Sequence, residues 1–498
     1  MGHVTASTTV VAAPLLVGHH TSLMHGWVPI TVQAAAAVVL VSAVGWRSRR
    51  WRLLWLPVAA AVGVAVATWA RWSIADDGLA DDPAPRLLWW WIAFSGAAVA
   101  ISILGWRSAR WWRRSLSLLA VPLCVLSTAL VLNFWVGYFP TVQTAWNQLT
   151  AGPLPDESDS ASISAMAAKG IPPQHGSVVP VTIPDDASHF KHRGELVYLP
   201  PVWFASAHHP LAGDNPPPRL PTVMMIGGEF NTPADWVRAG NAVKTIDDLA
   251  AAHGGNAPVF VFVDSGGAFN NDTECVNGSR GNAADHLTKD VVPYMISHFG
   301  VSAKPSNWGI VGWSMGGTCA VDLTVMHPEL FSSFVDIAGD LGPDVGTKAQ
   351  TIARLFGGNA NAWAAFDPTT VIAKHGHYSG VSGWFDISSD TTPTGRRSVP
   401  VTDTGAVGLG GQDAIGNPND QTAAAESLCR LGRANGIDCA IVAQPGRHDW
   451  PFASRAFTTA LPWLAGRLGT PGVARIALPS GSSPPAPAPA PRANPIGR

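Results

Sequence analysis

The stretch Trp308-Gly-Ile-Val-Gly-Trp-Ser-Met-Gly-Gly317 decides the fold of the larger part of this chain. A short apolar strand runs into Gly312-Trp-Ser314-Met-Gly316, which has the G-x-S-x-G pattern of a nucleophile elbow. Its glycines let the strand and a following helix approach closely, while the turn holds the serine strained with its Oγ exposed. Residues 318–327 are predicted to form that helix, so we predict that Ser314 is a catalytic nucleophile.

Strands and helices alternate on both sides of this turn. Strands are predicted at 178–183, 195–204, 222–226, 258–263, 331–338, 405–409 and 438–443, and helices at 234–253, 283–299, 419–435 and 452–468. This alternation favours a mainly parallel sheet covered by helices on both faces. We assign 177–470 to this catalytic domain and predict that 471–498, rich in Pro and Ala, is a disordered tail.

A membrane anchor is predicted before this domain, in residues 27–138. Four apolar segments lie there, at 27–46, 53–72, 87–106 and 116–138, each near the roughly 20 residues that a helix needs to cross a bilayer. Tryptophans at their ends are typical of interfacial positions: Trp27, Trp46, Trp72, Trp106 and Trp135. The segments contain no Asp, Glu or Lys, which argues against an ion pathway or a transporter. We therefore predict four transmembrane helices.

Charge predicts the orientation of this anchor. Arginines cluster in the first and third connections (Arg47, Arg49, Arg50, Arg52, Arg107, Arg110, Arg113 and Arg114), whereas aspartates lie in the second (Asp76, Asp77, Asp81 and Asp82). By the positive-inside rule the first and third connections are cytoplasmic. The segment 1–26, the linker 139–176 and the catalytic domain would then lie outside the cytoplasm. Residues 1–26 contain no Lys or Arg, which argues against a cleavable signal peptide.

Cysteine usage agrees with that placement. Four of the five cysteines lie in the globular part, and an even number suits two disulfides in an oxidising compartment. We predict the pairs Cys275–Cys319 and Cys429–Cys439, with four buried free thiols as the alternative. The net charge of −2 gives no indication of a nucleic-acid partner.

A nucleophilic serine needs a base, and the base needs an acid that holds its tautomer. The predicted base is His448 in Pro445-Gly-Arg-His-Asp-Trp450, directly after the last strand. The predicted acid is Asp413 in Gly410-Gly-Gln-Asp413, and Asp420 and Glu426 on the next helix remain alternatives. Asp449 is a poor candidate for the acid, because the side chain of a residue next to the histidine in sequence rarely faces Nδ1.

An oxyanion hole needs backbone N–H groups directed at the developing charge. One is predicted to come from Met315 and the other from Glu229 or Phe230, in the loop after the strand 222–226. Phe230, Trp313 and Trp450 lie next to these pieces and could line an acyl or lipid pocket, although packing in the core is equally compatible. No metal-ligand spacing is present, so neither a metal nor a cofactor is expected.

These motifs resemble the esterase D-like α/β-hydrolases, which include S-formylglutathione hydrolases, enterochelin esterases and the antigen 85 mycolyltransferases. The resemblance covers about 178–468 and rests on 312–317, His327-Pro328, 362–368, 410–413 and 446–450. It implies a triad of Ser314, Asp413 and His448 and an oxyanion amide at Met315. In the mycolyltransferases the acid lies further along, on a helix, so Asp420 and Glu426 remain alternatives to Asp413. Residues 229–236 lack the arginine with which those enzymes hold trehalose.

The sequence thus predicts a membrane-anchored serine esterase or acyltransferase that acts outside the cytoplasm on an ester of the cell envelope or on a lipid. An aminoacyl-phosphatidylglycerol hydrolase and a mycolyltransferase are alternatives with the same chemistry. A catalytically inactive hydrolase-like binding or scaffold module is the alternative from another class.

Overall fold

The computed structural model describes residues 21–46, 48–77, 84–107, 110–136, 138–139, 141–150, 154–170, 172–206, 219–388, 418–446 and 448–479. The chain divides into two compact units, one formed by 1–68 and 85–152 and the other by 69–84 and 153–498. The boundary near 152 lies inside the predicted linker, and two short helices flank it, α5 (Val142–Leu149) and α6 (Ser160–Lys169).

The N-terminal unit is built from apolar helices. They are α1 (Trp27–Ala43), η1 (Trp51–Trp55) continuing as α2 (Leu56–Asp77), α3 (Arg86–Gly105) and α4 (Trp111–Val136). Three stretches among the described residues are long and apolar enough to cross a membrane: Trp51–Asp76, Arg86–Gly105 and Trp111–Trp135.

The prediction of four spans is corrected by α1, which has only 17 residues and would be about 26 Å long. The helix ends at Ala43 because Val44 adopts an extended conformation. The guanidinium of Arg113 donates to the carbonyl oxygen of Ala43 at 2.9 Å and so satisfies a C-terminal group that the helix leaves unbonded. Residues 44–46, predicted as the last turn of the segment, therefore lie outside the helix.

The second unit, called the catalytic unit because it contains the domain predicted to be catalytic, has an eight-stranded sheet in the order β1-β2-β4-β3-β7-β8-β9-β10. The strands are β1 (Ser177–Val181), β2 (Glu195–Leu199), β3 (Thr222–Ile226), β4 (Val259–Val263), β7 (Trp308–Trp313), β8 (Ser333–Ile337), β9 (Ser382–Ser388) and β10 (Asp438–Gln444). From β4 to β10 all neighbours are parallel, whereas β1 and β2 are antiparallel. Every residue of β3, β4 and β7 is buried, as expected for strands covered on both faces. The mainly parallel sheet predicted from the sequence is confirmed.

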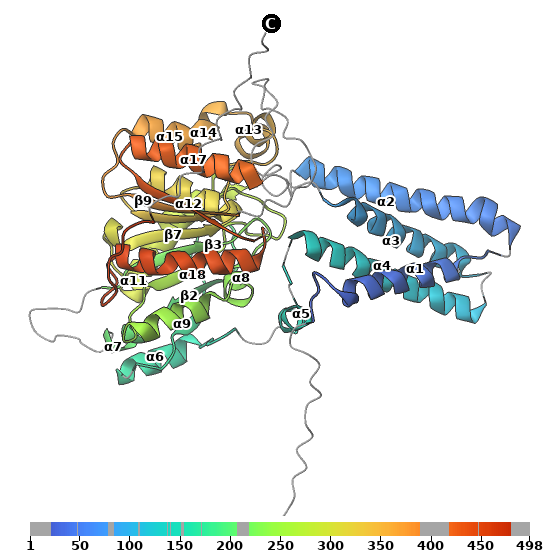
Figure 1. Cartoon of the computed structure of the whole chain (residues 1–498), viewed down its shortest axis with the longest axis horizontal. Coiled ribbons are helices and arrows are strands. Elements are labelled where there is room, and N and C mark those ends of the chain that lie inside the picture. The colour runs from blue at the N-terminus through green and yellow to red at the C-terminus, as the bar shows by residue number, and fades with distance from the viewer. Residues whose placement is uncertain are drawn as a thin grey trace, which may run out of the picture. The chain divides into compact units, whose positions relative to one another are not determined.

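Helices cover both faces of this sheet (Figure 1). On one face α9 (Ala242–Ala252) packs against α18 (Trp450–Arg467). On the other, α12 (Met315–Met326) packs against α15 (Pro368–His375), which in turn contacts α17 (Pro418–Ala434). Smaller elements connect these layers: α7 (Pro201–Ser206), α8 (Pro233–Arg238), β5 (Asn277–Gly278), β6 (Gly281–Asn282), α10 (Ala283–Asp285), η2 (His286–Val291), α11 (Val292–Phe299), η3 (Pro305–Asn307), α13 (Lys348–Phe356) and α14 (Ala360–Ala364).

Several elements differ from the predictions. The strand predicted at 195–204 ends at Leu199, and the helix α7 begins at Pro201. The helix predicted at 234–253 is two helices, α8 and α9, separated near Gly240, where a Cβ would lie 2.7 Å from the carbonyl oxygen of Trp236. The strand that lies between β8 and β10 is β9, which was not predicted. The strand predicted at 405–409 lies outside the described residues.

Both predicted disulfides are present. Cys275 is bonded to Cys319 on α12, and Cys429 on α17 is bonded to Cys439 on β10. The first bond closes a loop across a sequence separation of 44 residues and the second a loop across 10. The first therefore connects the segment after β4 to the helix that follows Ser314.

We expect loss of the Cys275–Cys319 bond to destabilise the catalytic unit more than loss of the Cys429–Cys439 bond. Loop-closure entropy predicts about 4 kcal/mol for the longer loop and about 2.7 kcal/mol for the shorter one. Pulse proteolysis of the full-length double-alanine variants across a urea gradient would measure both. Equal losses, or a larger loss for the Cys429 and Cys439 variant, would contradict the expectation.

Candidate active site

Ser314 lies at the junction of β7 and α12 with φ 58° and ψ −125°. A positive φ is strained for a residue with a side chain, and such strain is found at nucleophile elbows. The turn is possible because its neighbours lack a Cβ. A Cβ on Gly312 would lie 1.6 Å from the carbonyl oxygen of Gly316, and one on Gly316 would lie 2.4 Å from that of Ile226. The sequence pattern thus produces the backbone that exposes Oγ.

His448 lies in the loop between β10 and α18, and its Nε2 is 2.9 Å from the Oγ of Ser314. Two neighbours fix this position. The indole of Trp313 lies against the imidazole with ring centroids 4.2 Å apart, and the carboxylate of Asp449 caps α18 by accepting from the N–H of Phe452. Asp449 therefore holds the helix start rather than the imidazole. The structure brings together the nucleophile and the base that the sequence predicted.

The other imidazole nitrogen faces an amide. Gln421, buried on α17, has its Nε2 3.2 Å from Nδ1 of His448 and 3.3 Å from the carbonyl oxygen of Ala338. With that amide nitrogen donating, Nδ1 accepts and Nε2 carries the proton that points at Ser314. A general base needs the opposite tautomer, in which Nδ1–H donates and Nε2 accepts from the serine. A hydrogen-bond acceptor must therefore face Nδ1 in the reactive state.

The three acid candidates have different places in the chain. Asp413 lies outside the described residues. Asp420 lies in the first turn of α17, one residue before Gln421, and Glu426 is half-buried further along the same helix. Among the described side chains, the group that hydrogen-bonds Nδ1 of His448 is the Gln421 amide. Nothing in the sequence distinguished this glutamine from an ordinary helix residue.

The predicted oxyanion loop follows β3 and is tightly turned. The N–H of Gly228 donates to the side-chain oxygen of Asn231 at 2.8 Å, and a Cβ on Gly228 would lie 3.2 Å from that of Ser314. Glu229 and Phe230 are the next residues of this turn, and Met315 is the first residue of α12, where N–H groups lack intrahelical acceptors. Gly228, the neighbour of Glu229, thus lies beside Ser314, and Met315 follows Ser314 directly.

An ion pair between Arg193 and Asp264 holds this loop through a hydrogen bond to Asn231. The guanidinium of Arg193 contacts the carboxylate of Asp264 at 2.6 Å and 3.0 Å and also donates to the carbonyl oxygen of Asn231 at 2.8 Å. Bidentate pairs of this kind fix both position and direction. The hydrogen bonds from Arg193 hold the pKa of Asp264 below its ordinary value even though burial acts to raise it. Sequence reasoning missed this support because the two residues lie on different segments.

The aromatic residues predicted to line a pocket divide into two groups. Phe230 is half-buried and its ring lies 5.3 Å from that of Phe269, which is exposed. Trp313 and Trp450 are buried, with Trp450 packed edge-on against Trp236. Phe230 is thus accessible to a substrate, whereas the two tryptophans form the core beneath the imidazole.

Burial determines the protonation state of His448. Desolvation lowers the pKa of His448 to about 4, so the imidazole is neutral at pH 7 and able to accept a proton. Burial has the opposite effect on the pKa of two carboxyl groups on neighbouring strands. It raises the pKa of Asp336 to about 7 and that of Asp386 to about 6. One carboxylate oxygen of Asp386 accepts hydrogen bonds from Trp384 and Gln444.

Comparison with known proteins gives a sequence family. The Esterase family matches residues 192–460, which include Ser314 and His448. A relative from Corynebacterium glutamicum, an uncharacterized protein, is 30% identical over 377 residues, which are 71% of this chain and 81% of that protein.

Solved structures give more distant similarities. A ferulic acid esterase is 16% identical and covers 59% of this chain and 99% of its own, with a TM-score of 0.42. An S-formylglutathione hydrolase from Agrobacterium tumefaciens is 17% identical, and the match covers 60% of this chain and 97% of that protein, with a TM-score of 0.42. MPT51 of Mycobacterium tuberculosis is 19% identical, and the match covers 58% of this chain and 97% of that protein, with a TM-score of 0.37.

Proposed function

Because this chain belongs to the Esterase family, we propose that it is a serine esterase or acyltransferase that works through an acyl-enzyme on Ser314. The observation that carries the proposal is the distance of 2.9 Å between the Oγ of Ser314 and Nε2 of His448, with the serine on a strained turn. A nucleophile and a neutral base in hydrogen-bond contact are the minimum that acyl transfer requires.

The reaction would proceed in two halves. Nε2 of His448 takes the proton of Ser314 as Oγ attacks the ester carbonyl carbon, and the N–H groups of Met315 and of the Glu229 turn receive the oxyanion. The alcohol then leaves with the proton from His448. In the second half His448 deprotonates water or an acceptor hydroxyl, which attacks the acyl-enzyme, and Ser314 regains its proton. Water gives a hydrolase and a bound hydroxyl gives an acyltransferase.

We further propose that the substrate is an ester of the cell envelope or a lipid and that the reaction takes place outside the cytoplasm. Three helices long and apolar enough to span a bilayer, the arginine-rich connections and two disulfides support this placement. Tethering would raise the concentration of lipid substrates at the site. Aminoacyl-phosphatidylglycerol and mycolate esters are candidate substrates for this chemistry.

A fluorophosphonate probe tests the proposed chemistry directly, because it reacts with serines that have been activated as nucleophiles. We expect the purified full-length chain to be labelled in detergent, at Ser314 as mapped by mass spectrometry. Failure of the folded chain to react would favour the non-enzymatic hydrolase-like module.

The proposed triad acid, Asp413, can be identified by the pH dependence of kcat/KM. A carboxylate at Nδ1 would raise the pKa of His448 above the value of about 4 that burial alone produces. We expect Asp413→Asn to lower kcat by about 10⁴-fold. Its residual activity should persist to a lower pH than that of the wild type, since a base with a lower pKa stays neutral further into the acid range.

Asp420→Asn and Glu426→Gln are the matched controls in the same pH series. Each should retain wild-type activity and an unchanged profile if Asp413 is the acid. A large loss confined to either control would transfer the role to that residue while leaving the proposed nucleophile and base in place.

A further inference from the structure

A cavity of about 530 Å³ lies at the edge of the sheet where β9 and β10 begin. Ser314 follows the carboxyl end of β7, and the strands from β7 to β10 are parallel, so the cavity and Ser314 lie at opposite edges of the sheet. Small-molecule sites commonly enclose about 300–1,000 Å³. The cavity is therefore separate from the proposed active site and large enough for a ligand of its own.

Arginines from three different segments line this cavity. They are Arg433 on α17, Arg467 at the end of α18 and Arg475 in the segment after α18. The carboxylate of Asp438 lines it as well. Among the residues that the structure describes, no ion pair joins any of these three arginines to a carboxylate. The lining thus carries an excess of positive charge, and we propose that the cavity binds the phosphate group of a phosphate ester.

Hydrogen bonds to the protein orient two of the guanidinium groups. Nε of Arg467 donates to the Oγ of Ser382 at 3.1 Å, and its Nη2 donates to the carbonyl oxygen of Gly380 at 2.6 Å. Nη2 of Arg433 donates to the carbonyl oxygen of Cys439 at 2.7 Å. These acceptors are neutral, so they fix the guanidinium groups without cancelling their charges. Side chains that are already fixed lose less conformational entropy when a ligand binds.

A glycine brings Arg475 toward Arg467. The segment after α18 packs against Gly466, where a Cβ would lie 2.2 Å from the carbonyl oxygen of Ala474 and 3.1 Å from the Cα of Arg475. Burial and the charge of Arg475 lower the pKa of Arg467 below its ordinary value, whereas the charge of Asp438 acts to raise it. The fold thus holds two positive charges close enough to repel each other, and an anion bound between them would remove that repulsion.

A phosphate ester suits this lining better than a carboxylate or a free phosphate ion. Guanidinium groups donate paired hydrogen bonds to the oxygens of carboxylates and phosphates. A carboxylate has two oxygens, whereas a phosphate can accept from guanidinium groups on more than one side. A free phosphate ion would leave much of the cavity unfilled next to its apolar lining, which consists of Ile437, Trp463, Ile476, Ala477 and Leu478. The organic part of an ester would fill that space, whether the ester is soluble or is the headgroup of a phospholipid.

Calorimetric titration of the full-length chain in an uncharged detergent tests the proposal. We expect glycerol phosphate to bind at one site per chain, and less tightly at high salt, because salt screens the attraction between charges near the surface. Glycerol, which lacks the phosphate, should not bind at the same concentrations. Dihexanoylphosphatidylglycerol distinguishes the two sources of the ester. Binding tighter than that of glycerol phosphate would indicate a phospholipid headgroup, and weaker binding would indicate a soluble ester.

Arg475→Gln should weaken the binding of glycerol phosphate about tenfold, because it removes one charge-assisted donor. The fold should be unaffected, since Arg475 is exposed and makes no hydrogen bond with a described residue. Asp438→Asn should tighten binding, because it removes a negative charge from the lining. The matched control is Arg430→Gln, at an exposed arginine of α17 that does not line the cavity, and it should bind like the wild type.

A wild-type chain that binds no glycerol phosphate would overturn the proposal. Equal affinity in the wild type and in Arg475→Gln, or equal affinity for glycerol and glycerol phosphate, would overturn it as well. For the phospholipid, only the binding that is lost in Arg475→Gln counts, because apolar helices also bind lipid. Fluorophosphonate labelling of Ser314 reports separately on the proposed function.

Discussion

Replacing Ser314 with alanine is expected to lower kcat for p-nitrophenyl ester hydrolysis by on the order of 10⁶-fold, the loss found when a serine nucleophile of a comparable site is removed. The reason is geometric. Oγ is the atom that lies 2.9 Å from Nε2 of His448, and it belongs to a residue with the positive φ of a strained turn. An alanine leaves the base without a proton to accept, so no acyl-enzyme can form.

The same substitution should leave the fold intact, because alanine only removes a half-buried oxygen. Circular dichroism and the thermal midpoint of the full-length variant should match the wild type, and Ser297→Ala, at an exposed helix serine, is the activity control. Hydrolysis that survives Ser314→Ala at more than about a hundredth of the wild-type rate would rule out Ser314 as the nucleophile.

The parts of the fold that could be predicted are those with a local cause. The elbow follows from glycines that leave room for a neighbouring carbonyl, and β3 and β4 follow from uninterrupted apolar runs at 222–226 and 259–263. The disulfides could be predicted as present because an even number of cysteines lies in one domain.

What could not be predicted depends on contacts between distant segments. β9 reads Ser-Gly-Trp-Phe-Asp-Ile-Ser, which shows neither alternation nor an apolar run, yet all seven residues are buried. Gly383 is required there because a Cβ would lie 2.0 Å from the ring of Phe334 on β8, and Asp386 is tolerated because Trp384 and Gln444 donate to it. Phe334 and Gln444 lie on other strands, so these contacts cannot be predicted from the sequence of β9 itself.

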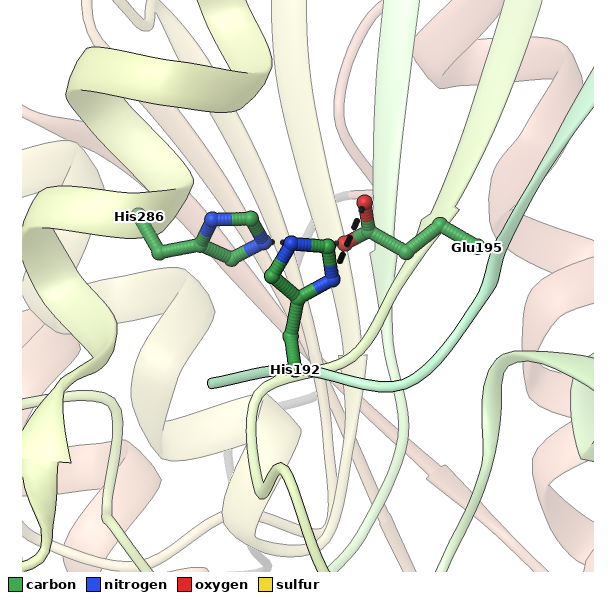
Figure 2. Close-up of side chains that lie close together, drawn as sticks. All are labelled: His192, Glu195 and His286. Carbon is green, nitrogen blue, oxygen red and sulfur yellow. Dashed lines mark hydrogen bonds and ion pairs between the residues drawn. The ribbon is translucent and has the colours of Figure 1, made fainter. Parts of the chain in front are cut away.

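The candidate site divides in the same way. Ser314 and His448 belong to short motifs whose order along the chain predicts their roles. Gln421 and Arg193 have no such motif, because their contacts with His448 and with the carbonyl oxygen of Asn231 join separate elements. The buried contacts among His192, Glu195 and His286 (Figure 2) could not be predicted either, since His286 is far from the other two in sequence.

Replacing His448 with alanine is expected to cost about as much as replacing Ser314, again on the order of 10⁶-fold in kcat. Without the imidazole no group among the described residues faces the Oγ of Ser314 as a base, and a neutral hydroxyl is a poor nucleophile. Because the two residues act as one unit, the double variant Ser314→Ala with His448→Ala should be no slower than either single variant within about tenfold.

The structure also predicts how this loss can be reversed. Removing the ring leaves a space bounded by the indole of Trp313 and the Oγ of Ser314, both of which contact the imidazole in the wild type. Free imidazole added to His448→Ala should enter it and restore part of the activity, saturably. Imidazole should have no effect on Ser314→Ala, which still has its own base. Losses that add in the double variant, or rescue that is equal in both single variants, would show that Ser314 and His448 do not act together.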